Sequence, residues 1–93
     1  MPCYNARMNE MERNLKALAN KRRLAILKYI KHVGRSSVGD IASEIKLSFK
    51  ATSRHLSILA NAGILEKEQE GLTVWHWMSK RKHQAAANVI KLL

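Results

Sequence analysis

The sequence lacks the features that mark membrane proteins, secreted proteins and disulfide-bonded proteins. Its 93 residues include one cysteine, Cys3, so no internal disulfide can form. No apolar stretch approaches the roughly 20 residues of a membrane-spanning helix, and the N-terminus lacks the charged and then apolar order of a secretory signal. We therefore expect one complete cytoplasmic domain over residues 1–93, with Cys3 as a free thiol or as a bridge between two subunits.

The sequence also lacks the motifs of enzymes and metal sites. It has no glycine-rich phosphate loop and no nucleophile–base pair at a telling spacing. Its histidines show no paired ligand spacing; they are His32, His55, His76 and His83. We predict a protein that is not an enzyme and that needs no metal or other cofactor.

Acidic residues are scarce as well. Seven Asp and Glu stand against seventeen Lys and Arg, which gives a formal net charge of +10. Such a charge attracts polyanions, namely DNA, RNA or an anionic membrane surface. Hydrophobic residues make up 46% of the chain, enough for a folded core, so the positive charge belongs to the surface of an ordered domain.

Apolar residues recur at helical spacing in the first two thirds of the chain. The pattern predicts helices over about residues 5–18, 21–32, 37–45 and 49–60. Asn20, Ser37 and Ser48 are suitable N-caps for the second, third and fourth helices. Gly63 suits a left-handed position after the fourth helix.

The residues after Gly63 change in character. Segments 64–69 and 72–78 are β-prone and are separated by a Glu70-Gly71 turn signal, and segment 80–93 returns to a helical pattern. The predicted order is α-α-α-α-β-β-α, mainly α with a small β-hairpin. Two short helices joined by a brief turn and followed by a hairpin are typical of a winged helix-turn-helix.

The predicted fourth helix, about residues 49–60, has two distinct faces. Thr52, Leu56 and Leu59 face the core, and the outward stripe has two cations, two hydroxyls and no acid: Lys50, Ser53, Arg54 and Ser57. Short polar and cationic side chains suit the major groove of DNA. Arg54 is the best candidate for a base contact because its guanidinium can bond guanine O6 and N7 together. The alternative is an ordinary solvated face.

Four further residues of this helix and of other segments are candidates for DNA contacts: Ser48, His55, Arg22 and Lys67. His55 lies between the two faces and either packs through a hydrogen bond or contacts a phosphate. Arg22 places a positive charge at the N-terminus of the second helix, where it is unfavourable with the helix dipole. An external anion bound at that N-terminus would offset this cost; the alternative is that the Arg22 side chain extends into water. Lys67 reaches DNA from the wing, but Glu66, Glu68 and Glu70 would repel the backbone, so we expect little affinity from the wing.

Three groups of residues follow one family pattern. The first is Leu15-Lys16-Ala17-Leu18-Ala19-Asn20 with Arg23-Leu24-Ala25-Ile26-Leu27. The second is Asp40-Ile41-Ala42, Leu47-Ser48 and Ser53-Arg54-His55-Leu56-Ser57-Ile58-Leu59, and the third is Ala62-Gly63-Ile64-Leu65 with Gly71. Over about residues 15–78 the chain resembles the ArsR/SmtB-like family of winged-helix repressors. The resemblance implies a homodimeric repressor that places two recognition helices in successive major grooves of a near-palindromic operator.

The resemblance also implies that the terminal helices, about 5–18 and 80–93, form the dimer interface. Both have apolar stripes beyond the needs of so small a core, and such faces usually require a partner surface. The expected interface residues are Met8, Met11, Leu15, Ala86, Val89 and Leu92.

The metal-sensing residues of the family are missing from this sequence. Ser37 and Gly39 stand where metal sensors of the family often have Cys-x-Cys, and the last helix offers His83 without a carboxylate. The means of induction stays open: none, an organic ligand, oxidation of Cys3 or a protein partner. Three further functions also stay open, namely protein–protein contact, non-specific nucleic-acid binding, and RNA binding through Trp75 and Trp77.

Overall fold

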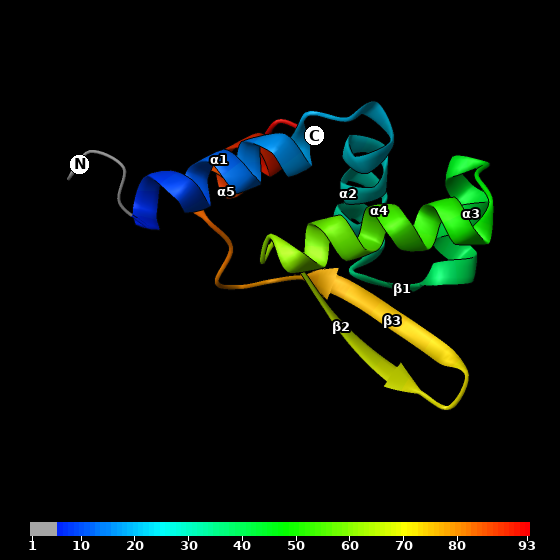
Figure 1. Cartoon of the computed structure of the whole chain (residues 1–93). Coiled ribbons are helices and arrows are strands. Elements are labelled where there is room, and N and C mark those ends of the chain that lie inside the picture. Colours follow the sequence, from blue (N-terminus) through cyan, green and yellow to red (C-terminus); the bar gives the residue numbers. More distant parts are fainter. Residues whose placement is uncertain (1–5) are drawn as a thin grey trace.

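The computed structural model describes residues 6–93, which fold into five helices and a three-stranded antiparallel sheet (Figure 1). The elements are α1 (Ala6–Leu18), α2 (Lys21–Val33), β1 (Arg35–Ser37), α3 (Val38–Ile45), α4 (Phe49–Asn61), β2 (Leu65–Glu70), β3 (Thr73–Met78) and α5 (Gln84–Lys91). The prediction of a mainly helical chain with a β-hairpin is confirmed. In Figure 1, α1 and α5 lie at one end, α3 lies at the other, and the hairpin projects away from the helices.

The strand β1 is an element that the sequence pattern did not predict. It pairs with β3, with Arg35 opposite Trp77 and Ser37 opposite Trp75, so that the sheet order is β1-β3-β2. Its three residues, Arg-Ser-Ser, have no apolar alternation. The strand therefore exists because β3 offers it an edge to pair with, and not because of its own propensity.

The three predicted N-caps are confirmed. The side chain of Asn20 accepts hydrogen bonds from the backbone N–H groups of Arg22 and Arg23 at 2.9 and 3.1 Å. Ser37 and Ser48 each accept one such bond at 3.1 Å, at the starts of α3 and α4. These bonds satisfy amides that a helix leaves without internal partners, and they fix where each helix begins.

The ends of several elements differ from the prediction. The last helix, expected over 80–93, spans only Gln84–Lys91, because His83 takes the N-cap position and its Nδ1 accepts from the Ala85 amide at 2.9 Å. The strand β2 begins and ends one residue later than predicted, and β3 begins one residue later but ends at Met78 as predicted, with Gly71 at φ +61 in the turn. Gly63 has φ +78, as predicted. Asn5 and Cys3 lie outside the described residues.

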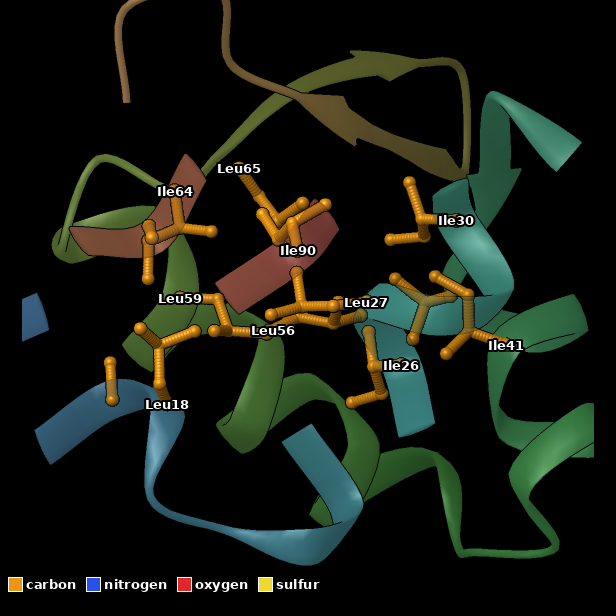
Figure 2. Packing of buried hydrophobic residues seen from close by; sticks show 13 residues of the cluster. Leu18, Ile26, Leu27, Ile30, Ile41, Leu56, Leu59, Ile64, Leu65 and Ile90 are labelled. Atoms are coloured by element: carbon orange, nitrogen blue, oxygen red, sulfur yellow. The ribbon is translucent and has the colours of Figure 1, made fainter. Parts of the chain in front are cut away.

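One hydrophobic core holds the helices to the base of the hairpin (Figure 2). Its largest fully buried apolar side chains come from α2, α3, α4 and the segment before β2: Ile26, Leu27, Ile30, Ile41, Leu56, Leu59 and Ile64. Leu18 of α1 and Ile90 of α5 extend it. The core therefore fixes α4 against α2 and leaves the far side of α4 to the solvent.

A lysine fastens α5 to α2. Lys31 Nζ donates to the backbone carbonyls of Ile90 at 3.0 Å and of Leu93 at 3.2 Å. A cation at a helix C-terminus satisfies unpaired carbonyls and interacts favourably with the helix dipole. This contact, together with buried Ile90, keeps the short last helix against the body of the domain.

Candidate nucleic-acid interface

The turn between α3 and α4 sets the direction of α4. Lys46 has a left-handed backbone with φ 57, and the Leu47 amide donates to the Ala42 carbonyl at 3.0 Å. A non-glycine residue in this conformation costs about 1 kcal/mol, and the helix-ending hydrogen bonds offset that cost. Ser48 then caps α4 immediately. Three residues thus suffice to connect α3 to α4 and to change the direction of the chain.

The outward face of α4 is exposed as predicted and has no internal partners. Thr52, Leu56 and Leu59 are buried, whereas Lys50, Arg54 and Ser57 are exposed and Ser53 is half-buried. Within residues 6–93, none of the side chains of Lys50, Ser53, Arg54 and Ser57 makes a hydrogen bond or an ion pair. These donors are therefore available to an external ligand without breaking contacts within the domain.

His55 packs through a hydrogen bond, the first of the two alternatives. Its Nδ1 lies 3.1 Å from Nη1 of Arg23. Since an arginine only donates, Nδ1 accepts and the imidazole is neutral, with its proton on Nε2. Arg23 also donates from Nε to the Ala17 carbonyl at 2.6 Å and from Nη2 to the Lys16 carbonyl at 3.3 Å. One guanidinium on α2 therefore joins the end of α1 to the middle of α4.

The charges around His55 show that cations from two helices converge beside α4. Burial lowers the pKa of His55 from its usual value, and the positive charges of Arg23, Arg22 and Arg54 lower it further. Arg22 is exposed at the start of α2, while Arg54 belongs to the outward face of α4. The fold thus brings two predicted site residues into one positive field, although they lie far apart in the sequence.

The wing, which is the hairpin of β2 and β3, has its acidic and basic side chains on opposite faces. Glu66 and Glu68 lie opposite Trp77 and Trp75 across the β2–β3 pair, whereas Lys67 lies opposite His76. Because side chains alternate along a strand, the carboxylates share the outer face with the tryptophans. Lys67 is exposed on the other face, where its charge adds to the effect of burial and lowers the pKa of His76. Lys67 is therefore separated from the repelling glutamates.

A cation covers the tryptophans of that outer face. The guanidinium of Arg35 lies 4.7 Å from the ring centre of Trp75 and 5.6 Å from that of Trp77, and it forms a 3.3 Å ion pair with Glu70. Such stacking is a favourable cation–π contact. Trp75 and Trp77 thus pack under Arg35 on this face.

Three residues near the site were not predicted from the sequence. Arg23 and Arg35 were not singled out, because their roles depend on partners 32 and 35 or more residues away. Phe49, the first residue of α4, was taken as the start of a helix and nothing more. Its side chain is 62% exposed. The sequence did contain a signal for this exposure, because Phe49 is an apolar residue outside the predicted core stripe, between an N-cap and a lysine.

Most of the residues expected at the dimer surface are exposed or half-buried in the single chain, but Ala86 is not. Met8, Met11 and Leu15 on α1 are 50%, 45% and 49% exposed, and Leu92 after α5 is 85% exposed. Val89 is half-buried against the core. Ala86 is fully buried within the single chain, because the small side chain lets α5 approach the core closely. It therefore has no surface to offer a partner, and the prediction for Ala86 is wrong.

No group of three or more His, Cys, Asp or Glu residues in the range 6–93 is arranged to hold a metal ion. No helix in the same range has both the length and the apolar character needed to cross a membrane.

Comparisons with known proteins agree with this geometry. A family model described as "Bacterial regulatory protein, arsR family" matches residues 20–67. The transcriptional activator HlyU of Vibrio cholerae is 34% identical, and the alignment covers 92% of this chain and 85% of HlyU. The structure of reduced HlyU matches with a TM-score of 0.77, covering 92% of this chain and 86% of that one.

A second relative extends the comparison to another organism. A crystal structure of a fragment of a possible transcriptional regulatory protein from Mycobacterium bovis has a TM-score of 0.81 at 29% identity, covering 94% of this chain and 89% of that one. The solution structure of the fragment, with a TM-score of 0.77 at 28% identity, covers 91% of this chain and 75% of that one. It is described as a homodimeric winged helix-turn-helix DNA-binding domain. These similarities confirm the predicted winged helix-turn-helix fold.

Proposed function

Because this chain belongs to the ArsR family of bacterial regulatory proteins, we propose that it binds a near-palindromic operator in double-stranded DNA as a homodimer. The observation that carries the proposal is the outward face of α4, whose cations and hydroxyls have no partners within residues 6–93. A groove-reading helix needs such donors free, since they must bond to phosphates and base edges. The family assignment and the site geometry thus support one function by separate routes.

The residues of the interface have different roles in this proposal. Arg54 bonds a guanine edge, and Lys50 neutralises a phosphate. Ser53 and Ser57 donate to bases or phosphates from the same face, and the Ser48 hydroxyl, which already caps α4, lies exposed beside the backbone. Arg22 and Lys67 approach flanking phosphates. His55 acts by positioning α4 through Arg23.

The dimer proposed here is formed by α1 and α5 of each copy. Its support is the exposed apolar surface of Met8, Met11, Leu15 and Leu92, beside which Val89 is half-buried, and the homodimeric state described for the Mycobacterium bovis relative. We expect Leu15→Lys to yield monomers at micromolar concentration, measured by light scattering, because a buried unpaired cation is strongly unfavourable at an interface. The exposed Leu72→Lys at the hairpin tip is the control and should remain dimeric.

We take residues 1–93 as one regulatory domain without enzymatic activity, acting in the cytoplasm where bacterial DNA lies. Occupying an operator that overlaps a promoter represses transcription by exclusion and requires only the dimer and its DNA contacts. Repression is therefore the mode that needs the fewest additional surfaces on this chain.

Selection of bound fragments from random duplex DNA at near-physiological salt tests the proposal. We expect an enriched, near-palindromic sequence. Arg54→Ala should cost about 1–3 kcal/mol on that sequence and relax the choice of one base pair, whereas Lys50→Ala should weaken all DNA alike and lower the salt slope by about one. Enrichment of no sequence, with equal losses for both variants on random DNA, would mean non-specific polyanion binding instead.

A further inference from the structure

We infer that Phe49 is a specificity-determining residue that reads the 5-methyl group of a thymine in the major groove. The inference rests on the proposed function, because it assigns one base contact within the proposed operator. It begins from an apolar side chain that the fold leaves outside its core. Phe49 is the chain's one phenylalanine, and 62% of its surface is exposed.

The position of Phe49 is that of a base-reading residue. It is the first residue of α4, directly after the N-cap Ser48 and before Lys50. In helix-turn-helix proteins the N-terminal residues of the second helix contact base edges. Phe49 is also four residues before Ser53, so the two side chains are neighbours along one side of α4. The capped start of the helix therefore holds Phe49 at the leading end of the proposed interface.

The chemistry of Phe49 selects one group in the groove. A phenyl ring has no hydrogen-bond donor or acceptor, so it cannot read guanine, cytosine or adenine by their polar edges. Thymine alone presents an apolar group there, the C5 methyl, and phenylalanine is among the side chains that contact it. The surrounding hydroxyls and cations can bind the DNA phosphates and the neighbouring bases while Phe49 packs against the thymine methyl.

Phe49 does not serve the packing of the domain. Phe49 is absent from the core cluster and from the partly buried residues packed against it. The other strongly exposed apolar residues on helices or at their ends lie mostly on the proposed dimer surface, which involves α1 and the end of α5. Phe49 is on α4, next to Lys50, where an operator is expected and a second copy is not. DNA is therefore the partner that its surroundings favour.

The experiment removes the methyl group itself. In the selected operator, each thymine is replaced by deoxyuridine, one symmetric pair at a time, and the affinity of the full chain is measured at constant salt. At one pair we expect the affinity to fall about fourfold per half-site, the effect of losing one buried methyl group. Phe49→Ala should bind the thymine operator more weakly and become indifferent to deoxyuridine at that pair.

Two further variants make the result specific. Ile58→Ala changes another exposed apolar residue of α4, 38% exposed and more than two turns further along, and it should retain the full response to deoxyuridine. Phe49→Gln, carried through a new selection, should replace thymine by adenine at the same position, since glutamine bonds adenine N6 and N7. Circular dichroism checks that the variants are folded, which the exposure of both side chains leads us to expect.

The outcomes distinguish this inference from the proposed function. An operator whose affinity is indifferent to every thymine methyl, or a Phe49→Ala protein that keeps the wild-type response, overturns the inference and leaves operator binding standing. Selection that enriches no sequence overturns both. A loss at one thymine pair that disappears with Phe49→Ala and persists with Ile58→Ala establishes the contact.

Discussion

The outward face of α4 and the outer face of the wing are neighbours in the sequence, yet they have opposite character. The first has two cations, two hydroxyls and no carboxylate; the second has three carboxylates, two tryptophans and one arginine that stacks on them. A net charge of +10 therefore says little by itself about where DNA binds. The arrangement of the seven acids is more informative, because three of them lie on one strand.

The difference extends to how the side chains are bonded. On the wing, Arg35 is committed to Trp75, Trp77 and Glu70. On α4, Lys50 and Arg54 have no partner among the described residues. Side chains that pack within the domain contribute to its stability, whereas side chains held free are available for recognition. Arg35 and Glu70 thus have partners within the domain, whereas the charged side chains on the outward face of α4 remain available to a ligand.

The largest effect is expected from removing the support of α4. Arg23→Met loses the hydrogen bonds to the Ala17 and Lys16 carbonyls and to His55. The unfolding free energy should fall by about 2–3 kcal/mol, because hydrogen bonds from a charged donor to partly buried acceptors are lost. Urea denaturation measures the change.

The neighbouring Arg22 provides the matched control for that experiment. Arg22 is exposed and its side chain makes no hydrogen bond within residues 6–93, so Arg22→Met should change stability by less than about 0.5 kcal/mol. Equal losses for the two variants would show that the hydrogen bonds of Arg23 between α1, α2 and α4 do not stabilise the position of α4.

A smaller effect is expected from neutralising the wing. The double variant Glu66→Gln and Glu68→Gln removes two exposed carboxylates from the outer face. Affinity for DNA should rise about threefold to tenfold without a change in the selected sequence, since the removed repulsion is worth about 1 kcal/mol in water and carries no base information. Fluorescence anisotropy with the selected and a scrambled duplex measures both.

Glu12→Gln is the control for the wing variant, because it removes a carboxylate from α1, where Glu12 pairs with Lys16. It should leave DNA affinity within about twofold, as expected of an exposed ion pair far from the interface. If the wing variant gains nothing over this control, the hairpin does not approach the duplex and the contrast between the two faces has no effect on binding.

The smallest effect is expected from pH. The pKa values of His55 and His76 are both lowered in the folded state, burial being the largest cause for each. The unfolded chain therefore binds protons more readily, and stability must fall as pH decreases below the usual histidine value of 6.5. Above that value the contribution is fully present.

Denaturation at pH 7.5, 6.5 and 5.5 in constant salt checks the pH effect. His55→Asn should flatten part of the slope, because an asparagine oxygen can accept from Arg23 and does not titrate. A wild-type stability that is constant or rises toward pH 5.5 would contradict the assigned direction of the shifts.

The sequence predicted the parts of the fold that depend on local chemistry. Asn20, Ser37 and Ser48 cap their helices because a short polar side chain before an apolar repeat can bond only the first amides. The stripe of Lys50, Ser53, Arg54 and Ser57 lies outward because Thr52, Leu56 and Leu59 must be inside. Periodicity determines which face is exposed whenever the opposite face is strongly apolar.

The sequence did not predict what depends on distant partners. β1 has no alternation of its own and forms only because β3 lies beside it. Arg23 meets His55 across 32 positions. Ala86 belongs to an apolar stripe that serves the core and the surface at once, and the pattern could not tell which members the core would take. Pairing and depth of burial are properties of the assembled domain.

The contact of Lys31 with the end of α5 has a consequence for the operator. It holds α5, a helix of the proposed dimer interface, against α2, and α4 also packs against α2. In the proposed homodimer the two α4 helices are therefore joined through rigid contacts. A rigid dimer fixes the distance between its two α4 helices. For such a dimer we expect half-sites separated by one turn of the duplex, about 10–10.5 base pairs from centre to centre, or by a multiple of it. An inserted base pair would rotate one half-site away from its reader, however well its sequence matched.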